Sequence, residues 1–511
     1  MDRPRAQRIV VISLLLGLAT VRLAFGLPIG LNAPAVAALV LVGAALTRPA
    51  GARFDPLDAW LPAGALALMA GAALRGDPTL QLVDIGLGAI LVTASVPAIA
   101  GLAVTRRSVT RLAELASRIF ANVVVAGAPL LLAAAPPADR AALASGRRAI
   151  APVARGLGIA IPVVLLFVLL FAGADAVFAR VAGQALHPDL DLGDLPSRGS
   201  LALIVAWLAA GLFAVWTDVL PRGAEAGSAD GASAPVALPA GWVPPPDRSP
   251  VGHGTTEALV VLAAVDALFA LFVGLQVAYL FGGHDTLAVA GLTYSDYARR
   301  GFFELVIVAG LAIGLVVVVD RVVGERRRSV VGASIVLVGL TLVVLASAFL
   351  RLRLYQDAYG WTELRFYVLT TIGFLAFALV ATAALLARDR IVWLGHALAF
   401  GGVAVVAALA LVGPVEFIAA RNLERAMDPS LVPAGGRTGL DAGYVAGLGD
   451  DAIPALVAAY RRLPARDARL VGQTRADRWA VLRDDPADRD PAAWNLGRAR
   501  ARAALLELFG P

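Results

Sequence analysis

Long apolar stretches recur along most of the chain and are separated by short polar segments that contain arginine. A helix needs roughly 20 mostly apolar residues to cross about 30 Å of membrane hydrocarbon. The pattern therefore predicts an all-α protein, a polytopic membrane helical bundle. Its stretches predict about eleven membrane-spanning helices, at residues 8–25, 30–46, 57–74, 80–104, 156–173, 199–220, 256–282, 300–320, 329–350, 365–387 and 391–414.

Three parts of the chain depart from this pattern and set its domain organisation. Residues 105–155 are rich in arginine and predict a cytoplasmic segment, with an interfacial or re-entrant helix at 119–135. Residues 221–254 are rich in Pro, Gly, Ala and Ser, which predicts a disordered cytoplasmic linker. Residues 415–511 carry apolar positions at helical spacing, which predicts a small helical domain outside the membrane. The predicted spans divide into sets of four, two and five, within 1–104, 156–220 and 255–414.

The distribution of arginine predicts the orientation of the chain. Cytoplasmic loops of membrane proteins carry an excess of positive residues. With a cytoplasmic N-terminus, 21 arginines fall in cytoplasmic segments, nine fall on the opposite side, and 14 lie in the tail. An odd number of spans places the C-terminal tail outside the cytoplasm, and we expect a bacterial plasma membrane protein. If residues 119–135 crossed the membrane, every later loop would change sides.

Composition excludes several classes of protein. Of the 511 residues, 59% are hydrophobic and 16% are charged, and the mean hydropathy is +0.77, which rules out an ordinary cytosolic enzyme. The chain has no cysteine, and all 44 basic residues are arginine, so it has no thiol chemistry and no phosphate-binding lysine of an ATP-driven motor. The net charge of +6 follows from arginine in cytoplasmic loops. It therefore indicates a lipid bilayer, and not a nucleic acid, as the partner.

One carboxyl group is expected deep in the membrane. Asp266 lies ten residues into the predicted span 256–282, where a charge is costly and usually faces the bundle interior. It fits an ion or proton relay or a substrate contact, or else a protonated side chain that binds a neighbouring helix. Other acidic residues lie nearer span ends and are expected at the interface. These are Asp84, Asp218, Glu304 and Asp320.

A cluster of arginine and tyrosine is predicted on the outer face between residues 276 and 367. The planar guanidinium group of arginine binds carboxylate or phosphate through two hydrogen bonds, and tyrosine contributes an apolar ring that ends in a polar hydroxyl group. The cluster suits an anionic small molecule or lipid headgroup, or else an aromatic belt with structural ion pairs. The candidate contacts, together with Asp266, are Gln276, Tyr279, Tyr297, Arg299, Arg300, Glu304, Arg351, Arg353, Tyr355, Tyr359 and Arg365.

Familiar catalytic patterns are missing from the sequence. The four histidines have no zinc-site spacing, and no nucleophile and base stand in a known arrangement. Residues 447–450 match the G-x-G-D motif of intramembrane aspartyl proteases, but they lie in the tail and we treat them as a chance match. We therefore expect no catalytic, cofactor-binding or metal-binding residues, and an enzyme is the least supported class.

Several longer strings stand out in the second half of the chain. They are QVAYLFGG (276–283), TYSDYARRGFFEL (293–305), RLRLYQDAYGWTELR (351–365), FIAARNLER (417–425) and WNLGRARAR (494–502). With these strings the chain resembles a family of bacterial, largely actinobacterial, multi-pass membrane proteins that is known as a domain of unknown function, of the type numbered 4173. The resemblance covers the chain from about residue 150 to its end, and it implies a membrane protein without an established activity. In place of the family's Asn-Pro-Asp-like turn after the last span, this chain has Gly413-Pro414-Val415.

Two functional hypotheses remain. The first is a transporter or lipid-handling protein that holds an anionic or lipid-linked substrate at the outer face, through Asp266 and the arginine–tyrosine cluster. The second is a non-enzymatic envelope scaffold or signalling partner, which would bind an envelope protein through the C-terminal tail.

Overall fold

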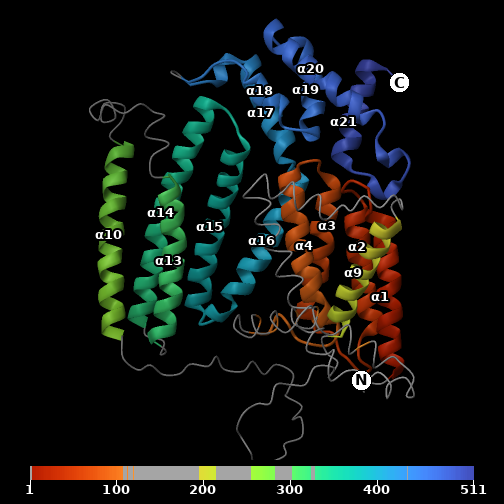
Figure 1. Ribbon diagram of the computed structural model, residues 1–511. Helices are drawn as coiled ribbons and strands as arrows, with labels where there is room; N and C mark the ends of the chain where they lie inside the picture. The colour runs from red at the N-terminus through yellow and green to blue at the C-terminus, as the bar shows by residue number, and fades with distance from the viewer. Residues whose placement is uncertain are drawn as a thin grey trace, which may run out of the picture. The chain divides into compact units, whose positions relative to one another are not determined.

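The computed structural model describes residues 3–107, 195–214, 255–281, 302–323, 328–433 and 436–510, together with a few single residues between 112 and 130. The regular elements within these ranges are all helices, and none is a strand (Figure 1). The predicted span 156–173, the linker 221–254 and nearly all of 105–155 lie outside the described residues. The described chain forms two compact units, and Gly71–Asp84, at the turn between two helices, belongs to the second.

The first unit contains the N-terminal membrane helices and one later helix. Helices α1 (Arg3–Ala24) and α9 (Leu195–Phe213) pack closely at Gly17. Any side-chain carbon at this position would lie only 2.2 Å from the carbonyl oxygen of Ala202, so the glycine is what allows the contact. Small residues allow helix backbones to approach in this way. The unit also contains α2 (Asn32–Thr47) and most of α3 (Trp60–Leu74) and α4 (Pro78–Ile99).

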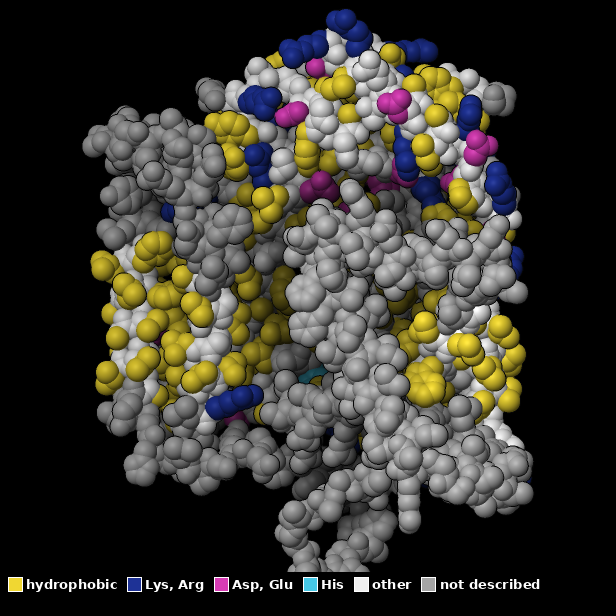
Figure 2. All heavy atoms as spheres, viewed as in Figure 1, with side chains coloured by type: hydrophobic (Ala, Val, Ile, Leu, Met, Phe, Trp, Pro, Cys, Tyr) yellow, Lys and Arg dark blue, Asp and Glu magenta, His cyan; other side chains and the backbone are white. Residues whose placement is uncertain are grey.

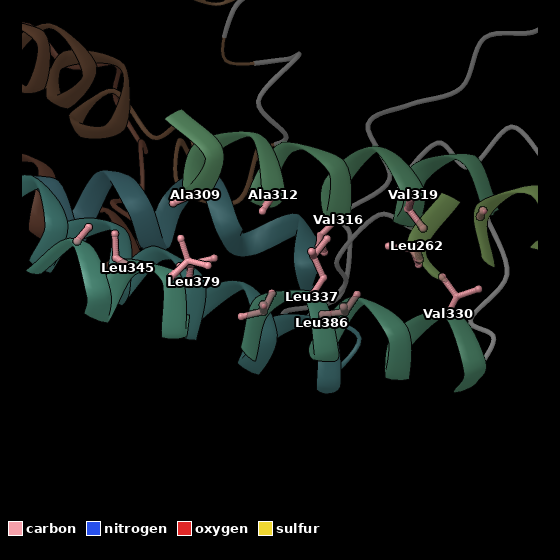
Figure 3. Packing of buried hydrophobic residues seen from close by; sticks show 14 of the residues in the cluster. Leu262, Ala309, Ala312, Val316, Val319, Val330, Leu337, Leu345, Leu379 and Leu386 are labelled. Carbon is pink, nitrogen blue, oxygen red and sulfur yellow. The ribbon is translucent and has the colours of Figure 1, made fainter. Parts of the chain in front are cut away.

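Four apolar helices in the second unit share one hydrophobic core. They are α10 (Thr255–Phe281), α13 (Phe302–Val323), α14 (Arg328–Tyr359) and α15 (Glu363–Ala387). Helix α16 (Leu394–Val412) follows α15 in the same unit. In Figure 3, small side chains of α13 such as Ala309 and Ala312 lie toward Leu345 of α14 and Leu379 of α15. Alternation of small and large side chains lets α13, α14 and α15 pack closely.

The C-terminal tail consists of shorter helices that pack onto this second unit. Its buried side chains share a hydrophobic cluster with Trp361 and Phe366, which belong to the α14–α15 hairpin. Figure 2 shows arginine and acidic side chains over the tail helices, whereas hydrophobic side chains cover α10 and its neighbours. An independent tail domain is therefore not confirmed. The main tail helices are α17 (Pro414–Met427), α18 (Ala442–Ala446), α19 (Ile453–Ala459), α20 (Ala465–Leu482) and α21 (Leu496–Phe509).

The described helices coincide closely with the predicted apolar stretches, with two instructive differences. Helix α14 continues nine residues beyond the predicted end at residue 350, because polar residues such as Arg353 and Asp357 extend the helix past its apolar part. Helix α4 ends at Ile99 instead of residue 104, before Gly101 with its φ of 95°.

The protein is membrane-embedded. Six of the described helical segments are long and apolar enough to cross a membrane, so the predicted total of eleven is not confirmed. The segments are Arg3–Ala24, Pro56–Leu74, Pro78–Ile99, Arg328–Tyr359, Glu363–Ala387 and Ile391–Val412.

Candidate functional site

The turn between α3 and α4 gathers several buried polar side chains of the second unit. Asp77 precedes the first residue of α4 and is 3% exposed. One of its carboxylate oxygens accepts a hydrogen bond from the Thr79 backbone N–H at 2.9 Å, and the other accepts one from the Tyr367 hydroxyl of α15 at 2.9 Å. The first bond caps the helix N-terminus, where backbone N–H groups lack partners. Asp77 thereby links α4 to α15.

A polar stripe continues from Asp77 along one face of α4. Gln81 and Asp84 follow Asp77 by four and seven residues, so all three lie on the same side of the helix. The Gln81 side-chain amide donates to the carbonyl oxygens of Ala72 at 3.1 Å and Arg75 at 2.7 Å. These carbonyls lie at the end of α3, where carbonyl oxygens have no partner within the helix. Gln81 thus closes the hairpin.

Asp84 lies fully buried at the inner end of this stripe. Neither of its carboxylate oxygens has a hydrogen-bond partner among the described residues. A side-chain carbon at Gly71 of α3 would come within 2.8 Å of Asp84 Oδ2 and 3.0 Å of the Ala410 Cβ of α16. The sequence suggested an interfacial position for Asp84 near a span end, and the structure adds that the carboxyl group is buried against Gly71 of α3.

Arg75, at the end of α3, binds the C-terminus of α16. Its side chain is 8% exposed and donates to the carbonyl oxygens of Ala410 at 2.5 Å and Leu411 at 2.6 Å. Its third contact is an ion pair with Glu416 of α17 at 3.1 Å. A cation at a helix C-terminus satisfies both the free carbonyls and the helix dipole. Next to it stands Gly413, whose φ of 68° makes the sharp corner between α16 and α17.

Two tail residues hold the same turn from the other side. Asp451 is 5% exposed and accepts a hydrogen bond from the Gly76 N–H at 2.9 Å. Burial raises the pKa of this carboxyl to about 6, and the nearby Asp77 adds to the rise, whereas the Gly76 hydrogen bond and Arg75 act against it. The Asn495 side chain, 2% exposed, donates to the carbonyl oxygens of Ala72 and Arg75 at 3.1 and 2.9 Å.

The neighbouring Asp450 completes an ion pair within the tail. It accepts two hydrogen bonds from the Arg478 guanidinium of α20, one of them at 2.6 Å from Nη2. The hydrogen bond to Asp450 raises the pKa of Arg478 above its ordinary value. In the G-x-G-D motif at residues 447–450, the aspartate is therefore held by an arginine of the tail.

The predicted arginine–tyrosine cluster forms, in part, at the α14–α15 turn. Arg351, Tyr355 and Tyr359 are spaced by four residues and lie along one side of α14. The Arg365 guanidinium stacks 4.1 Å from the Tyr355 ring centre, and it donates to the Gly360 carbonyl oxygen at 2.7 Å. The rings of Tyr355 and Tyr359 are 5.1 Å apart. Arginine and tyrosine thus meet where the hairpin reverses.

A second arginine pair lies on the other side of this turn. Arg353 lies 5.4 Å from the Trp361 ring centre and 3.7 Å from Asp357, and its side chain is 39% exposed. From α17, Arg425 donates to the Asp357 and Ala358 carbonyl oxygens at 2.9 and 3.1 Å, while its Nε is buried without a hydrogen-bond partner. Burial lowers the pKa of Arg425, and the positive charge of Arg365 acts in the same direction. The turn therefore gathers positive charge.

The remaining predicted contacts lie in α10, in α13 or outside the described residues. Tyr297, Arg299 and Arg300 lie outside the described residues, as do Tyr294 and Asp296. Gln276 and Tyr279 fall in α10 and Glu304 in α13, but only their backbones are described. Asp266 lies one turn after the fully buried Leu262, and its Oδ1 is buried without a hydrogen-bond partner.

The sequence pointed to Tyr367 only as a member of the arginine–tyrosine cluster, and it did not point to Arg75, Asp77 or Asp451 as contacts of a site. A signal for the turn was present in the spacing Asp77-x-x-x-Gln81-x-x-Asp84, since a polar stripe inside an apolar helix is unusual. Their tail partners carry no comparable signal. Within the described ranges, no group of three His, Asp or Glu side chains could hold a metal ion.

Comparison with known families gives one match. The model of the family described as "Domain of unknown function (DUF4153)" matches residues 63–459, more than half of the chain. This confirms a family of unknown function, but not the number 4173 or an actinobacterial origin. No curated protein and no solved structure is significantly similar to the chain.

Proposed function

Because the chain belongs to the family of the domain of unknown function numbered 4153, whose activity is not established, we propose from its own residues that it transports or handles an anionic or lipid-linked substrate. The observation that supports this is the gathering of Arg353, Arg365 and Arg425 at the α14–α15 turn, beside Tyr355 and Tyr359. The partner group is a phosphate or another compact anion, which arginine binds through paired N–H donors.

The turn fits such a ligand in charge and in access. Arg353 and Tyr359 are both more than a third exposed, so a headgroup at the membrane surface would reach them. The buried Arg425 Nε supplies a donor without a partner. Nearby, Asp357 and Glu363 offset only part of the positive charge. By the orientation that the arginine count predicts, this turn opens to the outer face of a bacterial plasma membrane.

Binding of a short-chain lipid tests the proposal. Full-length protein in detergent is titrated with dioctanoyl phosphatidylglycerol. Binding is followed by the fluorescence of the protein's tryptophan residues, one of which, Trp361, lies beside Arg353. Arg353→Gln should weaken binding about tenfold, because it removes one charge-assisted contact. Arg388→Gln is the control, since Arg388 is an exposed arginine at the end of α15.

Two further ligands identify the source of the anion. Inorganic diphosphate tests a free phosphate group, and dioctanoyl phosphatidylcholine tests a lipid without net charge. If Arg353→Gln binds phosphatidylglycerol as tightly as the unmodified protein does, the anion site is rejected. The alternative, an envelope scaffold that acts through the exposed charged face of the tail, would then be preferred.

A further inference from the structure

A carboxyl group without a donor is buried inside the membrane-spanning part of α4. Asp84 is fully buried, and neither of its oxygens has a hydrogen-bond partner among the described residues. A side-chain carbon at Gly71 of α3 would meet both Asp84 Oδ2 and the Ala410 Cβ of α16, so the carboxyl group lies against the bare backbone of α3 at this glycine. An ionised carboxylate in such surroundings is strongly unfavourable, whereas a protonated carboxyl is tolerated. The geometry therefore requires a positive ligand on Asp84.

The hydrogen bonds of Asp77 determine whether Asp77 or Asp84 binds the positive ligand. The two lie on one face of α4 and within electrostatic range of each other. Asp77 accepts hydrogen bonds from the Thr79 N–H and the Tyr367 hydroxyl, which stabilise its charged form. Two carboxyl groups in one site do not readily ionise together. A proton shared between them thus belongs on Asp84.

Among the described residues, no cation donates a hydrogen bond to Asp84. Helix α15 carries three titratable groups near this site, Glu363, Arg365 and Tyr367. Arg365 is bound to the α14–α15 turn through the Gly360 carbonyl oxygen, Glu363 lies within electrostatic range of Asp77, and Tyr367 lies within range of both Asp77 and Asp84. From the tail, Asp451 approaches Asp77 through Gly76. The basic group of the turn, Arg75, is held by the end of α16 and by Glu416. A proton needs no further ligands, so it fits a single buried carboxyl group.

We infer that Asp84 is a reversible proton-binding site. In the protonated state an O–H bond forms on one carboxylate oxygen and the negative charge disappears. On release the O–H bond breaks, the proton is taken up by water, and the electron pair stays on Asp84. The proton site itself does not depend on the proposed function. Only the role of the proton, as the ion whose binding is coupled to movement of the anionic substrate, rests on that proposal.

Infrared spectroscopy tests this site without a substrate. The full-length protein is reconstituted into lipid vesicles, and spectra are compared between about pH 5 and about pH 9, a range in which an unperturbed aspartate stays ionised. The C=O stretch of a protonated carboxyl, which carboxylates lack, should be present at the lower pH and diminish at the higher one. It should be absent in Asp84→Asn and shifted in Asp84→Glu.

Two control variants assign the signal. Asp477→Asn changes an exposed carboxyl in the tail and should leave the band unchanged. Asp266→Asn separates the contribution of the carboxyl in α10.

A third variant tests the coupling between the two carboxyl groups. Tyr367→Phe removes the donor to Asp77 and should change the pH at which the Asp84 band titrates, which a purely structural Asp84 would not show.

Several outcomes would overturn the inference. It is wrong if folded Asp84→Asn protein keeps the full band, or if the band persists at every pH, which would indicate a permanently protonated structural residue. The lipid titration is independent of this measurement. A pH-dependent Asp84 band combined with normal lipid binding by Arg353→Gln would retain the proton site and reject the proposed substrate.

Discussion

At the scale of single residues, Asp451 makes a contact whose strength depends on pH. The carboxyl is buried in the tail and accepts the Gly76 N–H, and burial raises its pKa from the ordinary 3.8 to about 6. Between these two values the folded protein holds a proton that the unfolded chain has released. By linkage, the stability associated with Asp451 is fully present below about pH 4 and is lost as the pH rises through 6.

This predicts a specific effect of Asp451→Asn. The amide resembles the protonated carboxyl and keeps an acceptor oxygen for Gly76, so the variant should lose the part of the pH dependence that Asp451 causes. Between pH 4 and pH 7 that part amounts to about 3 kcal/mol. The apparent Tm values of the variant and of the unmodified protein, measured in detergent, should become equal at acidic pH. At neutral pH the variant should have the higher apparent Tm. Parallel Tm profiles of the variant and the unmodified protein would contradict the assignment, and Asp477→Asn provides the exposed control.

At the scale of helices, α16 depends on a side chain far away in sequence. The helix has few polar residues of its own, and its last carbonyls are taken by Arg75 of α3. The same guanidinium reaches Glu416 in the first turn of α17. One arginine therefore fixes the end of a membrane helix, the corner at Gly413 and the start of the tail.

Arg75→Gln should accordingly destabilise the protein by about 2–4 kcal/mol, because it removes charged hydrogen bonds that are shielded from water. Arg388→Gln is a matched control, since Arg388 also donates to a carbonyl of its helix, that of Ala384, but is exposed. Its expected effect is within about 0.5 kcal/mol. Thermal unfolding in detergent compares the two, and equal losses of stability would contradict the role of Arg75.

The sequence predicted the positions of the described helices well but not their partners. Length and hydropathy mark a membrane helix, so α10, α13, α15 and α16 begin and end close to the predicted limits. A helix that is apolar all round does not reveal which face is buried. Asp84 was expected at an interface because it lies near the start of the predicted span 80–104, and the sequence does not show that it is buried against α3. The contacts of Asp451 and Asn495 with the α3–α4 turn connect residues far apart in the chain, and no local pattern announces them.

At the scale of the whole molecule, the orientation of the chain remains a prediction from its arginines. A reporter enzyme that is active only outside the cytoplasm, fused after residue 430, should be active. A fusion after residue 140 should be inactive, because the arginine-rich segment stays in the cytoplasm. Activity measured in intact cells, normalised to the amount of protein, decides between the two locations. Should the first fusion be inactive, the α14–α15 turn would face the cytoplasm.

Asn495 has a consequence for synthesis of the chain. Its side chain completes the hydrogen bonding of the Ala72 and Arg75 carbonyls, 423 and 420 residues earlier. A ribosome makes the α3–α4 turn early and the residue that completes it near the very end. Until then Gln81 is the other side chain that bonds both carbonyls. The final assembly of this turn must therefore follow translation of almost the entire protein, and a ribosome that stalls before residue 495 leaves it unfinished.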